Sequence, residues 1–296
     1  MLIDHAVRNP WDYRYPATFD EGLLRTSFRS EFGRDPRYTE KSWPAFRELV
    51  GFMEADSEVA DIRWMAYMLA TVYFETSQPI REKVRVLTKK GTALKDRKGH
   101  PVTRTVKRWA ITMQPVTEVG RGAGREYFLP VKVKKLTSTT ARITEQDGHQ
   151  FIVSSGSRPK KLTKAAERGS PANAPSTKIY DDDEGDEISY YGRGYVQLTW
   201  WSNYAAAGGT IGLGLDLLYD PDKVEKPDIA YAIMSYGMRT GEGFANKHKF
   251  TDYFHGPIAD YVGARAMVNG KNKRDEIAAI ARKFEFVLFV GRSANC

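Results

Sequence analysis

Glu75 closes a mostly apolar stretch of the chain, residues 70–74. The stretch ends a predicted helix, because apolar residues recur every three or four positions: Ile62, Ala66, Leu69, Ala70 and Tyr73. Apolar neighbours and the negative end of the helix dipole both raise the pKa of a carboxyl group placed there. A carboxyl that stays protonated near neutral pH can act as a general acid, whereas a solvated glutamate at a helix end has no such role.

A second candidate carboxylate, Glu118, precedes the glycine-rich loop 120–125 (GRGAGR). The loop has neither the Gly-Lys-Ser/Thr signature nor the strand–helix frame of a phosphate loop. A third segment, residues 190–204 (YYGRGYVQLTWWSNY), concentrates aromatic, amide and hydroxyl side chains. Aromatic rings stack on sugar rings and amides bond hydroxyl and acetamido groups, so this mixture indicates sugar binding. A fourth segment, residues 265–270, by itself predicts only a helix end and an Asn-Gly turn.

Together, and in this order, the segments resemble glycoside hydrolase family 19, most closely its bacterial and phage branch of predicted chitinases and cell-wall lysins. The resemblance covers residues 20–78, 112–127 and 189–290 but does not reach 128–188, and its most specific block is YYGRG…QLTW. It implies a mainly α, lysozyme-like (α+β) glycoside hydrolase fold with an inserted small β-rich segment. It also implies inverting cleavage of β-1,4 bonds at N-acetylated amino sugars, with no cofactor and no metal.

By the same resemblance, Glu75 is the general acid, a second carboxylate is the base, and Thr199 orients the attacking water. The sugar-binding positions fall on Gln197, Trp200, Asn203 and Asn269, while Tyr191 and Arg193 shape the cleft. The sequence departs from the family at Phe74, where a histidine is usual. A hydrophobic neighbour can still raise the pKa of Glu75.

The base is harder to assign than the acid, because relatives place the base about ten residues after the acid. Glu118 lies 43 residues after Glu75, and residues 78–111 look inserted. Glu82, in the similar run Gln78-Pro79-Ile80-Arg81-Glu82, is the alternative. The GRGAGR context favours Glu118. If residues 78–111 form a hairpin, the ends of the hairpin meet and Glu118 returns beside Glu75.

Charge is distributed unevenly along the 296 residues, whose net charge is +8. Residues 81–168 hold 22 Lys and Arg against 7 Asp and Glu, and the rest of the chain holds 23 against 30. An acidic run, residues 181–187, follows the basic segment and can fold back on it. The basic segment favours an anionic cell-envelope partner. A single cysteine, Cys296, and five scattered histidines argue against a disulfide scaffold and a His/Cys metal site.

The elements that must position these residues change type along the chain. Helical patterns cover residues 19–32, 43–53 and 62–73, and return at 227–236 and 277–288. Alternating or β-branched runs, with an Asp147-Gly148 turn, predict strands between 102 and 153, and residues 157–178 have the composition of a linker. We therefore expect residues 1–77 and 189–296 to form the catalytic body. Residues 78–188 form an insertion, within which 112–127 return to the cleft.

The leading function is hydrolysis of peptidoglycan glycan strands, of the endolysin or antibacterial effector type. A chitinase is the first alternative, and a non-enzymatic nucleic-acid- or wall-binding protein is the second. The basic segment has few aromatic residues, which argues against nucleic acid. No apolar run is long enough to span a membrane, and we expect a monomer. Residues 1–16 lack the apolar core of a secretory signal. We therefore expect the protein to be made without a signal peptide and to act on the cell wall, in the periplasm, after release or secretion.

Overall fold

A nearly all-buried helix, α3 (Ile62–Glu75), lies at the centre of the helical body. The computed structural model describes residues 18–59, 61–155, 185–268, 270 and 272–292. Helix α3 packs against α8 (Arg274–Gly291), which also packs on α1 (Glu21–Phe32), and α2 (Ser42–Ala55) lies beside them. A helix that is apolar on all sides must be surrounded by other elements that shield it from water. The predicted helices of both chain ends therefore form one body.

Aromatic residues from three helices fill the core between α1, α2 and α8. The Phe28 and Phe46 rings stack with centroids 4.2 Å apart, and Phe284 of α8 lies 4.5 Å from Phe32. Both α1 and α3 begin at an aspartate cap: Asp20 accepts from the backbone of Leu23 and Asp61 from that of Arg63, each at 2.8 Å. The core and the Asp61 cap fix the position of α3, whose last residue is Glu75.

A second group of helices follows: α5 (Trp201–Thr210), α6 (Asp216–Tyr219) and α7 (Pro227–Thr240). Helix α7 begins at Pro227, as predicted, and ends at Thr240. Its C-cap is Gly241, whose φ of 78° is left-handed. The remaining short elements are 3-10 helices η1 (Glu126–Phe128), η3 (Pro221–Glu225), η4 (Gly243–Ala245), η5 (Phe250–Asp252) and η6 (Gly263–Met267), and strands β9 (Phe254–His255) and β10 (Ile258–Ala259). No helix within the described residues is long and apolar enough to cross a membrane.

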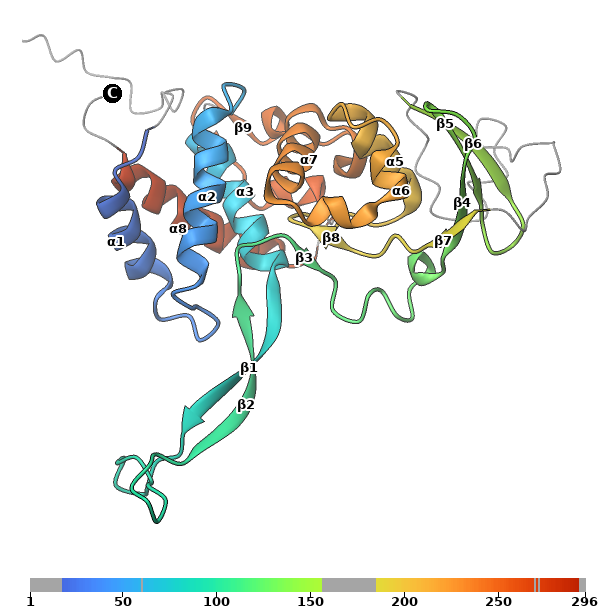
Figure 1. The fold of residues 1–296 in the computed structure, drawn as a ribbon. Coiled ribbons are helices and arrows are strands. Elements are labelled where there is room, and N and C mark those ends of the chain that lie inside the picture. The colour runs from blue at the N-terminus through green and yellow to red at the C-terminus, as the bar shows by residue number, and fades with distance from the viewer. Residues whose placement is uncertain (1–17, 60, 156–184, 269, 271, 293–296) are drawn as a thin grey trace, which may run out of the picture.

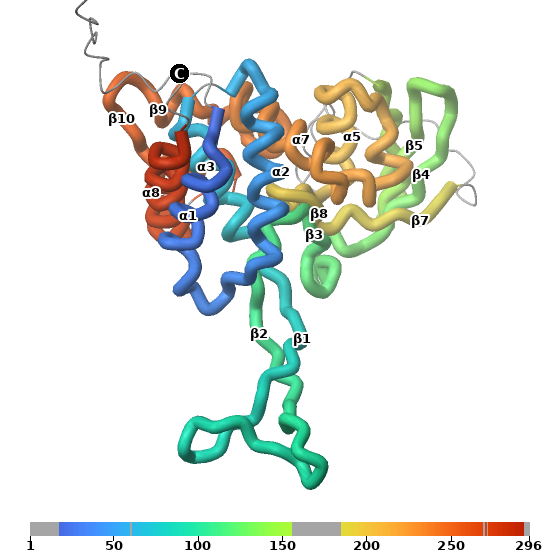
Figure 2. The backbone as a smooth tube through the Cα atoms, turned by 60° about the vertical axis from the view of Figure 1, so that its left-hand side comes forward, coloured from blue at the N-terminus to red at the C-terminus, as the bar shows by residue number. Residues whose placement is uncertain are grey.

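Strands β1 (Ser77–Arg85) and β2 (Thr103–Ile111) form an antiparallel hairpin that projects from the helical body (Figures 1 and 2). Its register runs from Ser77 opposite Ile111 to Arg85 opposite Thr103. The chain therefore leaves the body directly after α3 and returns to the same place. The hairpin anticipated for residues 78–111 is present.

The rest of the predicted insertion forms a separate four-stranded sheet in the order β6-β5-β4-β7. Its strands are β4 (Val131–Lys135), β5 (Thr140–Thr144), β6 (Gln150–Ser154) and β7 (Asp186–Ile188). The predicted turn at Asp147-Gly148 joins β5 to β6. Asp186 and Glu187 of the acidic run pair with β4, so this end of the run does fold back. The predicted linker 157–178 and residues 181–184 lie outside the described residues.

The four-stranded sheet rests on α5 through Trp201. The indole Nε1 donates to Glu145 at 2.9 Å, and its ring lies 5.4 Å from that of Phe151. Residues 78–155 thus contain two β units on different parts of a helical body, and not one continuous insertion (Figure 1). The expected fold class, mainly α with inserted β-rich segments, is confirmed.

Candidate active site

Glu75 is the last residue of α3, and its side chain is 16% exposed. Its Oε1 accepts a hydrogen bond from Arg265 Nη2 at 2.9 Å, while Oε2 has no hydrogen-bond partner among the described residues. Burial raises the pKa of the Glu75 carboxyl, and the Arg265 charge and hydrogen bond oppose this effect without cancelling it. The raised pKa expected from an apolar helix end is therefore present. The free oxygen can carry a proton.

Arg265, on η6, is the group that holds Glu75 in place. Its side chain is 1% exposed, and its Nε donates to the carbonyl of Asn272 at 3.1 Å. The guanidinium also lies 5.7 Å from the ring centroid of Phe74, a cation–π contact. The sequence placed Arg265 only at a helix end. One signal was available, because a buried arginine in a small, apolar segment requires an acidic partner.

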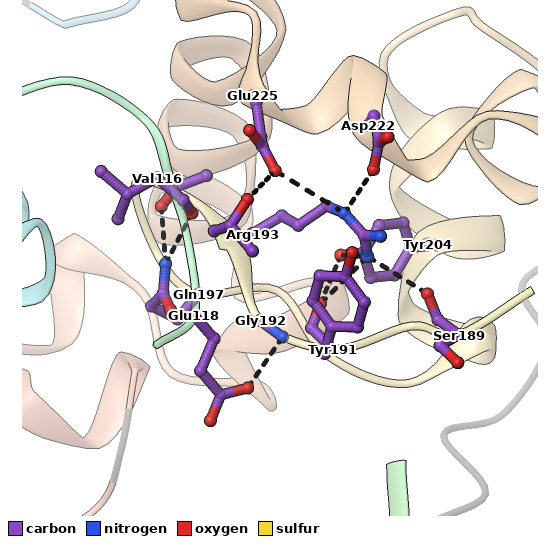
Figure 3. Close-up of polar contacts among 12 residues, drawn as sticks. Val116, Glu118, Ser189, Tyr191, Gly192, Arg193, Gln197, Tyr204, Asp222 and Glu225 are labelled. Atoms are coloured by element: carbon purple, nitrogen blue, oxygen red, sulfur yellow. Dashed lines mark hydrogen bonds and ion pairs between the residues drawn. The ribbon is translucent and has the colours of Figure 1, made fainter. Parts of the chain in front are cut away.

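Glu118 directly follows β3 (Val116–Thr117), which pairs with β8 (Arg193–Gly194). Its Oε1 accepts from the Tyr127 hydroxyl at 2.9 Å. Its Oε2 accepts from the Gly192 backbone N–H at 3.1 Å (Figure 3). Its own N–H donates to the Gly192 carbonyl at 2.7 Å. Both carboxylate oxygens are thus hydrogen-bonded, which suits an ionised carboxylate that accepts protons. Tyr127 was not anticipated, and its type and position gave no signal.

The base of the hairpin ties the segment after Glu75 to the segment before Glu118. Gln78 Nε2 donates to the carbonyl of Thr117 at 3.0 Å. Thr76 Oγ1 accepts from the N–H of Met113 at 3.1 Å, and Thr112 Oγ1 donates to the carbonyl of Thr76 at 3.1 Å. These contacts join residues that follow Glu75 by one and three positions to the segment 112–117, which precedes Glu118.

Glu82 lies on β1 and pairs with Arg108 on β2. Arg108 also donates to the carbonyl of Pro36, so both side chains are turned toward the α1–α2 connection. Glu82 lies five positions after Ser77 in extended strand, which places it about 17 Å along the hairpin. The structure therefore carries Glu82 away from Glu75, while the contacts at the hairpin base bring the segment of Glu118 close.

The segment after β8 has two residues in the left-handed backbone region, Gln197 (φ 51°) and Trp200 (φ 69°). Such conformations are uncommon outside glycine and cluster at functional sites. Gln197 Nε2 donates to the carbonyls of Val116 and Gly194 at 3.0 and 3.1 Å, so it braces the β3–β8 pair (Figure 3). The Trp200 ring packs edge-on against Tyr127 at 5.8 Å. Gln197 and Trp200 thus lie around Glu118.

Arg193 is buried, and its guanidinium group contacts other residues of the protein. It stacks on the Tyr191 ring at 3.7 Å, and its Nε donates to Asp222 at 2.8 Å (Figure 3). Its Nη1 donates to the Tyr204 hydroxyl at 3.2 Å. Arg193 therefore positions Tyr191 and the β8 turn from beneath and does not present a free charge to solvent.

Two further predicted residues sit on the same turn and helix. Thr199 is half-buried, and its carbonyl accepts from Asn203 Nδ2 at 2.7 Å. Asn203 is 5% exposed and lies within α5. The structure brings Glu118, Tyr191, Gln197 and Trp200 together and puts Asn203 behind Thr199. Asn269 lies outside the described residues.

The model of class I chitinases, glycoside hydrolase family 19, matches residues 141–241. Two endochitinases of Arabidopsis thaliana are 54% and 56% identical to the chain over 44 and 43 residues. Each stretch is 14% of this chain, and 15% and 14% of the respective relatives. Residues 141–241 are thus similar to glycoside hydrolase family 19, and the remainder of the chain lies outside that match.

Among solved structures, chitinase C from Streptomyces griseus HUT6037 aligns with 20% identity and a TM-score of 0.38. The alignment covers 94% of this chain and 97% of that one. The chain spans about a seventh of the length of the curated relatives it matches.

The family match divides the candidate residues into two sets. Tyr191, Arg193, Gln197, Thr199, Trp200 and Asn203 lie inside residues 141–241, and Glu75 and Glu118 lie outside. The match also begins within the four-stranded sheet, in a region where the sequence showed no resemblance. In the described part of the chain, no three His, Cys, Asp or Glu side chains are grouped as metal ligands.

Proposed function

We propose that this chain is a family 19 glycoside hydrolase that cleaves β-1,4 bonds between N-acetylated amino sugars, with the glycan strands of peptidoglycan as its substrate. One observation supports this most: a buried carboxyl with a raised pKa, Glu75, lies on a segment bonded to the one that holds Glu118. Two carboxyl groups in different electrostatic environments are what acid–base cleavage of a glycosidic bond requires.

In the proposed reaction, the protonated Glu75 gives its proton to the glycosidic oxygen through the free Oε2. As the proton leaves, Arg265 at 2.9 Å stabilises the new carboxylate. A water attacks the anomeric carbon from the opposite face, and Glu118 takes the proton that this water loses. The bond between the anomeric carbon and the leaving oxygen breaks as the bond to water forms, so the configuration inverts.

The hydrogen bonds around Glu118 fit the role of a base. The Tyr127 hydroxyl and the Gly192 N–H fix both carboxylate oxygens, so the orientation is set before substrate arrives. Thr199, on the adjoining turn, is assigned to orient the water. Gln197, Trp200, Asn203 and Asn269 are assigned to the sugars, with Tyr191 shaping the cleft.

Peptidoglycan is favoured over chitin because residues 81–168 are strongly basic and chitin is neutral. The proposed setting is the periplasmic cell wall, reached by release or by a dedicated secretion route. Chitin is the second candidate, and one observation favours it: the matched stretches of 44 and 43 residues belong to endochitinases.

Three single variants test the assignment of the carboxyl groups. Glu75→Gln and Glu118→Gln should each lower kcat by about 100-fold or more, because each removes a proton-transfer group. Glu82→Gln is the matched control and should keep nearly full activity. Full activity in Glu75→Gln would overturn the mechanism. Loss in Glu82→Gln with full activity in Glu118→Gln would reassign the base.

The substrate is tested on purified sacculi and on chitin oligosaccharides in parallel. We expect release of soluble muropeptides, whose masses and reducing ends identify the cleaved bond. Cleavage of chitin oligosaccharides with intact sacculi would replace the first candidate by the second. Lack of cleavage of both, by a folded protein, would remove the hydrolase proposal.

A further inference from the structure

The tip of the β1–β2 hairpin is forked into two turns of the same design (Figure 2). In the first turn, the N–H of Gly91 donates to the Thr88 carbonyl at 2.9 Å; in the second, that of Gly99 donates to the Asp96 carbonyl at 3.0 Å. Both glycines have positive φ, 78° and 86°. Each turn therefore presents its two central residues outward, and all four are basic: Lys89, Lys90, Arg97 and Lys98.

Three backbone hydrogen bonds hold the two turns side by side. Val86 N–H donates to the Val102 carbonyl at 2.9 Å, Leu94 N–H to the Val86 carbonyl at 2.7 Å, and Val102 N–H to the Leu94 carbonyl at 2.7 Å. Asp96, an acidic residue of the tip, accepts from the backbone of Lys98 and His100 and so is used within its own turn. The four basic side chains make no ion pair within the described residues.

Two exposed leucines adjoin the basic turns, Leu87 directly before the first turn and Leu94 between the two. The side chains of Leu87 and Leu94 are 59% and 42% exposed, although each is large and apolar. Residues 86–102 contain no Phe, Tyr or Trp. The tip thus combines basic side chains with aliphatic ones and has no aromatic surface.

The stem of the hairpin extends the positive charge along one face. The register places Arg81 opposite Lys107, with Lys83 and Arg85 following on the same face of β1. Glu82 and its partner Arg108 belong to the other face. The four basic residues of the first face are exposed and have no ion pair among the described residues. Positive charge therefore continues from the tip toward the helical body.

We propose that the hairpin tip, residues 86–102, docks on the surface of a bilayer rich in anionic phospholipid. Basic side chains that flank exposed aliphatic ones match the headgroup region, where phosphates meet the first methylene groups. Leu87 and Leu94 enter this boundary while the basic turns bind phosphates. The forked tip has no interior to bury the leucines by itself.

A bilayer fits these observations better than a nucleic acid. Single-stranded nucleic acids are bound through aromatic platforms, and the tip has none. A phosphodiester backbone does not bury the exposed leucines. A lipid boundary does remove their apolar surface from water, which is favourable in free energy. The proposal concerns residues 86–102 only and holds whatever glycan the cleft accepts.

Vesicle sedimentation of the full chain tests the proposal. The parent should bind vesicles that contain phosphatidylglycerol and not vesicles of phosphatidylcholine alone. The variant Lys89→Ser/Lys90→Ser/Arg97→Ser/Lys98→Ser should bind more than about 100-fold more weakly, because each basic residue near an anionic surface contributes about fivefold. A matched control, Arg34→Gln/Lys41→Gln/Lys226→Gln/Arg282→Gln, removes the same charge from exposed positions of the helical body and should bind nearly as the parent does.

A second measurement tests the leucines. In a Cys296→Ser background, Leu87→Cys carrying an environment-sensitive dye should shift to shorter wavelength with anionic vesicles, and Lys226→Cys should not. Equal binding by the tip variant and the parent would overturn the proposal. Tip-dependent binding of a DNA oligonucleotide without binding of vesicles would also overturn it. So would a dye at Leu87→Cys whose emission does not shift with anionic vesicles. Unfolding midpoints of all variants show whether each has folded.

Discussion

Glu118 and Gly192, 74 residues apart in the sequence, exchange two hydrogen bonds: one from backbone to backbone and one from the Gly192 N–H to the Glu118 carboxylate. A side chain there would displace these groups, because a Cβ at position 192 would lie 2.9 Å from Gln197 Oε1 and 3.2 Å from Glu118 Oε2. The loop 190–204 therefore sets the orientation of the carboxylate across the β3–β8 pair.

Gly192→Ala should lower kcat by about 10- to 100-fold with little change in KM, because displacement of a reacting group by a fraction of an ångström is costly. The measurement is steady-state hydrolysis of oligosaccharides. Gly51→Ala is the control, because the nearest atom to its added Cβ is a side-chain nitrogen at 3.6 Å and the position lies within α2. An unchanged kcat in Gly192→Ala would show that Glu118 does not depend on this contact.

Tyr127→Phe removes the donor to Glu118 Oε1. Burial and the hydrogen bond to Glu118 raise the pKa of Tyr127 to about 12, so the hydroxyl stays a donor throughout the working range. A hydrogen bond to a charged group contributes about 1.5–3 kcal/mol, so we expect kcat to fall by about 10- to 100-fold. Tyr231→Phe, which loses a similar bond to Asp56 at 2.9 Å, should leave kcat unchanged. Equal kcat values for the two variants would contradict a role for Tyr127.

If Glu75 is the acid, Arg265 should set the upper pH limit of activity. Burial raises the pKa of Glu75 and Arg265 lowers it, so loss of the positive charge allows the pKa to rise further. In Arg265→Gln, the pH above which kcat/KM declines should move up by about 1 to 3 pH units, since an opposite charge at this distance has an effect of that size. Arg265→Lys keeps the charge and should restore most of the parent profile. The same upper limit in all three proteins would show that Glu75 does not set it.

Glu75 also links stability to pH. The pKa of Glu75 is higher in the folded protein than in the unfolded chain, so the folded state holds the proton more tightly. The stability that this proton provides at low pH is lost as pH rises through the folded pKa. The Glu75→Gln variant has no ionisable group at this position. It should therefore have a higher free energy of unfolding than the parent at pH 7. The difference should vanish at pH values below the unfolded pKa. Urea unfolding at several pH values measures it, with exposed Glu48→Gln as control. A Glu75→Gln variant less stable than the parent at pH 7 would contradict the sign.

Local patterns were enough to locate most elements. The stripe of Ile62 to Tyr73 predicted α3, Pro227 predicted the start of α7, and Asp147-Gly148 predicted the β5–β6 turn. Each of these signals acts within a few residues of its own position. The separation of the insertion into two β units was not predictable, because it depends on where Trp201 of α5 binds the sheet.

Part of the site was predictable and part was not. The apolar end of α3 indicated the raised pKa of Glu75, and the glycine-rich context favoured Glu118 over Glu82. The partners were missed: Arg265 lies 190 residues from Glu75, and only the packing of η6 brings them together. Arg193 was expected to shape the cleft; its guanidinium contacts Asp222 and Tyr204, two partners that the sequence did not indicate. Residue type shows what a side chain can do, but tertiary packing decides which way it faces.

The β1–β2 hairpin begins and ends at paired residues, Ser77 and Ile111. The contacts of Thr76, Gln78 and Thr112 close its base, so the spacing between the two carboxylate-bearing segments does not depend on how long the arm is. A short turn, this forked arm or an unrelated module can occupy the same point without rebuilding the helical body. This junction is therefore a point at which engineering can shorten the arm or replace it.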